Sequence, residues 1–286
     1  ADRKSAPGPG CIRFISEPGV QVDLIGFGAA PENEMVKAYG RGPVGFSGLF
    51  FNRNHPLASS FALRKAFNLL VNRKLISAAS SDFTPIHQVL TSNFYGRLRS
   101  TYSQDVGQAK HLLRKSGIDL SKTYRAYWFT GRRELRGTDL AIQQMVQKQL
   151  ATGGVKLSFS ASGHPTFDST DRETLFRLDD RGTAFPDPLV IFKAFDAPAF
   201  LSPFLPKGSE GDLKRMLSSA TTSHTMSARI ATAEVLSKYF FDKAIVVPLY
   251  ERRAVYWVNE HRVQSIGDQH EVSLDLSKVV LKRATD

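Results

Sequence analysis

The side chains best suited to acid–base chemistry are two close pairs of aspartates, Asp179 with Asp180 and Asp168 with Asp171. Two carboxylates can divide the roles of general acid and general base when their surroundings separate their pKa values. Both pairs, however, lie in polar stretches typical of turns, where neighbouring aspartates usually cap backbone N–H groups or face solvent. The sequence therefore provides no acid–base pair, and we predict no catalytic residue and no enzymatic activity.

The histidines and the cysteine likewise form no recognisable catalytic or metal site. The seven histidines include no pair at the spacing of a metal motif, and we expect each to lie at the surface or in a loop. Cys11 is the single cysteine, and it follows a polar leader (residues 1–10) that we expect to be flexible. With no histidine placed beside it, Cys11 predicts neither a catalytic thiol nor an internal disulfide. We therefore expect no metal ion and no cofactor.

Two glycine-containing motifs are incomplete versions of known functional sequences. GFGAAP (26–31) follows the strand-like VDLI, but it lacks the third glycine of a dinucleotide-binding fingerprint and is interrupted by Pro31. GFSGL (45–49) lacks the second glycine of the turn that carries the nucleophile in serine hydrolases. A plain turn accounts for the first motif, and the second gives no support to a serine hydrolase.

The basic character of the chain raises the question of a polyanionic partner, because the formal net charge is +11. Lys and Arg are spread along the whole sequence, and the densest groups, GRRELR (131–136) and ERR (251–253), accompany no nucleic-acid motif. On the helix expected at 59–76, Arg64 and Arg73 lie away from the apolar face. We therefore predict a solvated basic surface and no nucleic-acid partner.

The length and composition are those of a globular protein. With 286 residues and 42% hydrophobic content, the chain is long enough for one large domain or two modest ones. No stretch reaches the roughly 18 apolar residues needed to span a bilayer. The first ten residues have no apolar core like that of a signal peptide, which leaves open whether the chain is mature, excised or cytoplasmic.

Hydrophobic spacing predicts an alternation of helices and strands that would hold any functional side chains. Apolar residues recur at three- and four-residue intervals in the helices, and the strands are short, aromatic or alternating. This order is typical of an α/β fold. We expect Ser103 and Thr138 to cap two helices. The predicted helices cover 32–40, 59–76, 103–117, 138–154 and about 209–242, and the predicted strands cover 48–52, 123–130, 155–162 and, as two strands or one bent near Pro248, 244–258.

A series of short motifs, each weak alone, occurs in the same order as in one known family. The helix LRKAFNLLVNRKLIS (63–77) resembles the family pattern V-R-x-A-x-x-x-A-I-D-R, with Arg64, Ala66 and Arg73 in place and Asn72 where the aspartate usually stands. The other matching segments are VQVDLIGFG (21–29), LFFNRNHP (49–56), YSQDVGQAKHLLRKSG (102–117), AIQQMVQKQLATGGVKLSF (141–159), GTAFPDPLVIF (182–192) and VVPLYERRAVYWV (246–258).

The family that these motifs resemble is the bacterial extracellular solute-binding proteins of family 5, and the match covers the C-terminal half of its members. The resemblance implies a periplasmic-binding-protein-like type II α/β fold, with a second lobe and a partial first lobe. Residues 1–50 would form part of lobe I, 51–243 lobe II, and 244–286 a return segment to lobe I.

The same resemblance implies a receptor that closes on a small solute or peptide and delivers it to the permease of an ABC transporter. A separate N-terminal half would be a further partner, and the location would be periplasmic or extracellular. The alternative on this scaffold is a ligand-sensing domain of a regulator, which would be cytoplasmic, or a degenerate protein-interaction module. By resemblance, the predicted ligand-binding residues are Arg181, Thr183, Ala184, Phe185, Asn52 and Tyr250.

One position departs from the pattern of classical peptide receptors. These receptors carry an aspartate four residues before the loop proline, where it pairs with the ammonium group of the peptide. Counting back from Pro188 gives Ala184, which has no charge. Because a buried ammonium needs a paired charge, the resemblance does not extend to recognition of an α-amino group.

Overall fold

The computed structural model describes residues 24–26, 36–129, 135, 137–162, 171–182, 187–197, 201–221, 225–259, 263–266 and 279–282. The chain divides into two compact units, one formed by residues 1–44 and 253–286 and the other by residues 45–252. The larger unit extends slightly beyond the segment 51–243 that we predicted as lobe II. The assignment of the two units to two lobes remains a prediction.

In the smaller unit the described residues form two short strand pairs and the first part of β2 (Val36–Phe51). Strand β1 (Leu24–Gly26) pairs antiparallel with the outer part of β7 (Val246–Asn259), so that Leu24 lies opposite Val258. Strands β8 (Val263–Ser265) and β9 (Val280–Leu281) pair antiparallel with each other.

The larger unit is built on a mixed sheet in which the strand order is β7-β2-β6-β4-β5, and β3 pairs with β7. Strand β4 runs parallel to both β5 and β6, whereas β2 runs antiparallel to β6. The helix α4 connects the parallel strands β4 and β5, as in a βαβ unit. The strands are β2 (Val36–Phe51), β3 (Phe83–Pro85), β4 (Thr123–Phe129), β5 (Lys156–Ser162) and β6 (Thr174–Gly182), together with the inner part of β7.

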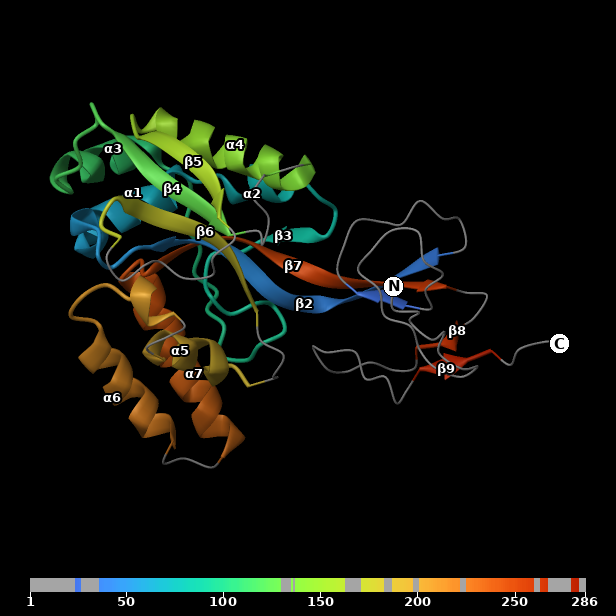
Figure 1. The fold of residues 1–286 in the computed structure, drawn as a ribbon. Coiled ribbons are helices and arrows are strands. Elements are labelled where there is room, and N and C mark those ends of the chain that lie inside the picture. Colours follow the sequence, from blue (N-terminus) through green and yellow to red (C-terminus); the bar gives the residue numbers. More distant parts are fainter. Residues whose placement is uncertain are drawn as a thin grey trace, which may run out of the picture. The chain divides into compact units, whose positions relative to one another are not determined.

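Helices cover both faces of this sheet (Figure 1). Helices α1 to α4 lie on one face, and α5 to α7 lie on the other. The helices are α1 (Phe61–Leu70), α2 (Arg73–Ser77), α3 (Val106–Lys115), α4 (Gly137–Thr152), α5 (Leu189–Asp196), α6 (Glu210–Thr221) and α7 (Met226–Asp242), with short 3-10 turns η1 (Pro56–Ser59) and η2 (Ser202–Phe204).

The alternation of side chains along β2 explains the two hydrophobic cores. Successive residues of a strand point to opposite faces of the sheet. Leu49 and Phe51 therefore enter the core beneath α1, α3 and α4, while Phe46 and Phe50 enter the core beneath α5, α6 and α7. Both sets are almost fully buried, so β2 is apolar on both faces, as expected for a central strand between two helical layers.

Several predicted elements differ in their boundaries. The helix expected at 32–40 is wrong where the structure describes it, because residues 36–40 belong to β2. The helix expected at 59–76 is interrupted between α1 and α2, where Asn72 caps the second helix by accepting from the backbone N–H of Leu75 at 3.0 Å. The side chain of Asn72 thus begins the second helix, whereas Val71 is the C-terminal cap of the first.

Two predicted caps were also misplaced. Asp105, not Ser103, caps α3, because its carboxylate accepts from the N–H of Gln108 at 2.8 Å. Helix α4 already includes Gly137, so Thr138 lies within its first turn.

Strand β7 continues through Pro248, whose carbonyl accepts a hydrogen bond from Arg73. None of the described helices is both long and apolar enough to cross a membrane.

The expectation that the arginines form a solvated basic surface is wrong for three of them. Arg64, Arg73 and Arg177 are almost completely buried. Arg64 donates to the carbonyl oxygens of Ala58 and Ala244 at 2.7 and 3.1 Å. Backbone carbonyls at the ends of helical segments carry partial negative charge, and these carbonyls replace the water that a guanidinium normally binds.

Candidate ligand-binding site

Strand β6 ends in a row of charged residues, which includes Asp179 and Asp180, the two aspartates that the sequence led us to place in a turn. Arg177, Asp179 and Arg181 alternate along the strand and therefore share one face of the sheet. The same carboxylate oxygen of Asp179, Oδ2, forms ion pairs with both guanidinium groups. The prediction that Asp179 is a solvated or capping turn residue is thus wrong, because its two arginine neighbours keep it buried within a strand.

Aromatic rings surround these charges. The Arg177 guanidinium lies 5.0 Å from the ring centroid of Phe204 and 5.3 Å from that of Phe129. Arg181 lies 6.0 Å from the ring of Phe50. Burial raises the pKa of Asp179 above its ordinary value, although Arg181 and Arg177 oppose this effect. In such a site the ion pairs are strong, and the loss of one partner would leave an uncompensated buried charge.

The opposite face of the same strand ends carries a second polar group. Ser47 on β2 lies directly opposite Asp180 on β6 and donates a hydrogen bond to its carboxylate. Arg252 on β7 pairs with the other carboxylate oxygen at 3.3 Å. Burial raises the pKa of Asp180 to about 6, against the effect of Arg252, while Asp179 and Asp139 raise it further.

Tyr250 belongs to this second group. Its ring stacks on Phe83 with a centroid distance of 4.1 Å. Tyr250 is buried, and desolvation raises the pKa of its hydroxyl, while Ser47 opposes this rise. Of the residues that we predicted to bind ligand, Arg181 on β6 and Tyr250 on β7 therefore lie at the same end of the sheet, on opposite faces and separated by β2.

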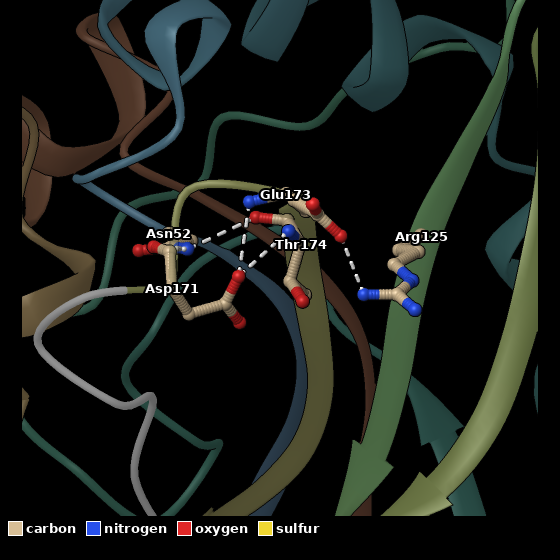
Figure 2. A network of polar contacts seen from close by, with 5 residues as sticks. All are labelled: Asn52, Arg125, Asp171, Glu173 and Thr174. Atoms are coloured by element: carbon tan, nitrogen blue, oxygen red, sulfur yellow. Dashed lines mark hydrogen bonds and ion pairs between the residues drawn. The ribbon is translucent and has the colours of Figure 1, made fainter.

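Asn52 lies at the other end of β6 (Figure 2). The register places Phe51 opposite Phe176 and Phe46 opposite Arg181, so Asn52 is separated from Arg181 by about 20 Å of strand. Its side-chain amide donates to the carbonyl oxygens of Asp171 and Thr174, each at 3.0 Å. The structure thus does not bring Asn52 together with Arg181 and Tyr250.

The network around Asn52 fastens the beginning of β6 (Figure 2). Asp171 accepts from the backbone N–H groups of Glu173 and Thr174, both at 3.0 Å, and Glu173 pairs with Arg125 on β4 at 2.6 Å. Because Asn52 is completely buried and engaged with the backbone, its observed contacts are those of a framework residue. Asp171 acts as a turn cap, as the sequence indicated.

The remaining predicted ligand residues, Thr183, Ala184 and Phe185, lie outside the described residues. The described residues that follow them are firmly anchored. Asp187 accepts from the N–H of Leu189 at 3.0 Å at the start of α5, and its carboxylate also forms an ion pair with Arg229 on α7. These contacts are those of a residue that shapes a turn.

The described part of the chain contains no group of three or more His, Cys, Asp and Glu residues that could hold a metal ion.

Two histidines accept hydrogen bonds from the backbone. His55 lies in a turn but is buried, and its ring nitrogen accepts from the N–H of Leu57 at 3.2 Å. His87 accepts from the N–H of Tyr102 at 3.1 Å. Burial, together with Arg73 and Arg97, lowers the pKa of His87 to about 4.

The lowered pKa of His87 predicts a specific acid sensitivity. The unfolded chain takes up a proton on this ring near pH 6.5, whereas the folded chain does so only near pH 4. The neutral ring therefore contributes stability above pH 6.5 that is lost as the pH falls from 6.5 to 4, and solvent screening of the half-buried ring reduces the size of this loss. Urea unfolding of the wild type and His87→Asn at several pH values should give curves that converge over this range. Parallel curves would contradict the assignment.

Comparisons with known proteins agree with the resemblance seen in the sequence. Residues 20–200 match the family described as bacterial extracellular solute-binding proteins, family 5 Middle. No curated protein matches the sequence. Many solved structures do, and those most similar in fold include the substrate-binding proteins of ABC transporters.

Three of these structures illustrate the range of ligands. CtaP from Listeria monocytogenes is 22% identical with a TM-score of 0.70, and the match covers 91% of this chain and 56% of CtaP. NikA from Staphylococcus aureus, in complex with Ni(L-His)2, is 14% identical with a TM-score of 0.73, covering 91% and 58% of the two chains. DppA from Helicobacter pylori, in complex with the peptide STSA, is 15% identical with a TM-score of 0.73, covering 92% and 53%.

These matches confirm the predicted fold class, α/β and periplasmic-binding-protein-like type II. The chain spans little more than half the length of the solved structures that it matches. The family match, in contrast, covers well over half of this chain and includes β2, the α1–α2 motif and the strand that carries Arg181. The chain belongs to the bacterial extracellular solute-binding proteins of family 5.

Proposed function

We propose that this protein is the solute-binding component of an ABC transporter and that it takes a peptide-type ligand. Family membership supports this proposal, as do neighbours such as DppA with a bound peptide and AppA from Bacillus subtilis with a bound nonapeptide. The partners would be the ligand, the transporter permease and, for this chain, a separate N-terminal half. The location would be periplasmic or extracellular, as for the family, and the role is that of a receptor and not of an enzyme.

The observation that carries the proposal is the ion-paired end of β6. The strand leads directly from Asp179 and Arg181 into the segment that contains Thr183, Ala184 and Phe185. Asp187 and Arg229 anchor the chain immediately beyond it. The described residues on either side of this segment, Arg181 and Asp187, are each held by an ion pair.

The mechanism that we propose is closure of the two units around the ligand. A ligand shifts the balance between open and closed states only by the difference between its affinities for them. Bending of the strands that connect the units is the usual structural basis of this kind of closure. Arg181, residues 183–185 and Tyr250 on β7 would provide the ligand contacts from the larger unit.

The uncharged Ala184 leads to a prediction about ligand preference. Without a carboxylate at this position, acetylation of the amino group of a bound peptide should change its affinity less than about threefold. In Ala184→Asp the free ammonium gains a paired charge, so the variant should prefer the free peptide over its acetylated form by about tenfold or more.

The measurement is isothermal titration calorimetry with matched free and acetylated peptides, using Ala184→Asn as the uncharged control of similar size. Ala184→Asn should show no new preference. If the wild type already rejects acetylated peptides, or if Ala184→Asp shows no preference for free ones, then position 184 does not face the amino end of the ligand. If no peptide binds any of the variants, the peptide-receptor function itself is contradicted.

A further inference from the structure

The two helical layers of the larger unit differ in their exposed charges. In α2, α3 and α4, which lie on the same side of the sheet (Figure 1), every exposed charged side chain is a cation. The acid within these helices, Asp139, is only partly exposed and interacts with Asp180 at the end of β6. The exposed cations, which we name the basic face, are Lys74 on α2, Lys110, Arg114 and Lys115 on α3, and Lys148 on α4.

The helices on the other side of the sheet carry charges of both signs. On α6, Arg215 forms an ion pair with Asp212, and on α7 Lys238 pairs with Asp242 at 2.6 Å. On the basic face, in contrast, none of the five cations is ion-paired with another residue in the part of the chain that the structure describes.

Like charges repel one another on the basic face. Lys110 and Arg114 are four residues apart on α3, and like charges at this spacing destabilise a helix. The neighbouring cations on α2 and α4 add to the same positive potential. Pairing within the described part of the chain does not relieve this repulsion, whereas an anionic partner would.

Close packing makes the three helices one surface. The backbone N–H of Asn72, at the start of α2, donates to the side chain of Gln149 on α4 at 2.7 Å, and the Asn72 side chain donates to Gln104, just before α3, at 3.2 Å. Beyond the end of α4, Gly153 approaches α3 so closely that a Cβ there would lie 2.9 Å from the side chain of Leu113. The five cations therefore lie on one continuous helical surface.

The chemistry of the basic face fits the surface of an anionic bilayer. The phosphate groups of acidic lipids attract Lys and Arg side chains, and each cation that reaches the membrane adds about fivefold to the binding constant. An exposed apolar side chain strengthens such a contact, because it can enter the boundary between headgroups and acyl chains. Leu75, beside Lys74 on α2, has this character, since it is 55% exposed. The absence of a nucleic-acid motif from the sequence favours lipid over nucleic acid as the partner.

We propose that the basic face binds peripherally to bilayers that contain acidic phospholipids. The contact is electrostatic and is made by Lys and Arg side chains, with Leu75 as its apolar part. Beside a membrane-bound permease, such a contact would keep the chain close to the membrane. Binding to lipid requires no solute, so this proposal stands or fails separately from the proposed receptor function.

Co-sedimentation of the full chain with lipid vesicles tests the proposal. The wild type should bind vesicles of phosphatidylcholine with about 30% phosphatidylglycerol at least about tenfold more tightly than vesicles of phosphatidylcholine alone, and added salt should weaken this binding. The triple variant Lys110→Gln, Arg114→Gln, Lys115→Gln should bind the anionic vesicles at least about tenfold more weakly than the wild type. Lys74→Gln with Lys148→Gln should weaken binding about fivefold or more, so that the test does not depend on one helix.

The matched control is the triple variant Lys214→Gln, Arg215→Gln, Lys238→Gln on α6 and α7. It removes as many exposed positive charges from the opposite layer, so attraction caused by the net charge of +11 alone would fall equally in both triple variants. We expect the control to bind within about twofold of the wild type. Equal losses in the two triple variants, or equal binding of the wild type to neutral and anionic vesicles, would overturn the proposal.

Discussion

Replacing Arg73 by methionine is expected to lower the free energy of unfolding by about 3–5 kcal/mol. Arg73 is only 3% exposed, and its guanidinium donates to the carbonyl of Pro248 at 2.7 Å and to the backbone and side-chain oxygens of Asn68 at 3.0 and 2.7 Å. Methionine fills a similar volume but donates nothing. Several buried oxygens at the junction of α1, α2 and β7 would lose their partners together.

Chemical denaturation measures this loss, and two further variants show its cause. Arg73→Lys keeps the charge but not the planar fork, so it should fall between the wild type and the methionine variant. Arg114→Met, on the exposed face of α3, should change stability by less than about 0.5 kcal/mol. A loss below about 1 kcal/mol in Arg73→Met would mean that these hydrogen bonds do not hold the α1–α2 junction to β7.

Asp179→Ala is the second variant with a large expected effect, a loss of about 3–5 kcal/mol in the free energy of unfolding. The carboxylate pairs with both Arg177 and Arg181, and its removal leaves two buried like charges beside each other. Thermal or urea unfolding measures the effect. Ligand affinity should fall as well, because Arg181 would lose the partner that orients it.

A double-mutant cycle separates the charge effect from the loss of packing. Removing Arg177 as well, in Arg177→Met with Asp179→Ala, eliminates one of the two uncompensated cations. The double variant should therefore be no less stable than Asp179→Ala alone, with a coupling of about 1–3 kcal/mol between the two positions. Additive losses would show that the two residues act independently and that the ion pair contributes nothing.

The parts of the fold that the sequence predicted best are those determined by local spacing. Helix α3 and the end of α4 follow from an apolar stripe and from glycines beyond the last turn, where Gly117 and Gly154 adopt positive φ angles. Left-handed backbone of this kind strongly favours glycine, so the signal is local. The Gly40–Gly45 region was harder, because its strand conformation depends on neighbours far away in the sequence.

The buried arginines could not be predicted from periodicity. A helical pattern separates apolar from polar positions, and it assigned Arg64 and Arg73 to the polar side. Their carbonyl partners on β7 and at the end of α7 lie more than 170 residues away in sequence. The family motif contained this information, since both arginines match it, but the motif alone does not say what the side chains contact.

The candidate site, too, could be predicted only in part from the sequence. The resemblance indicated Arg181 and Tyr250, and the structure places both at the same end of the sheet, on the strands that flank β2. Asp179 was missed because two adjacent aspartates in a polar stretch are typical of turns, and only the pairing of β6 with β2 shows that they lie on opposite faces of a strand. Asn52 was included because it matches a family motif, and its contacts fasten the start of β6 instead.

Native mass spectrometry of the freshly purified protein, in its full-length form, tests most directly whether this family member binds a solute. We expect a second species, heavier than the chain by the mass of a peptide-sized ligand. This species should disappear after unfolding and refolding and return on addition of the matching peptide. Only the mass of the bare chain, both as purified and after incubation with a panel of peptides and nickel–histidine complexes, would contradict it.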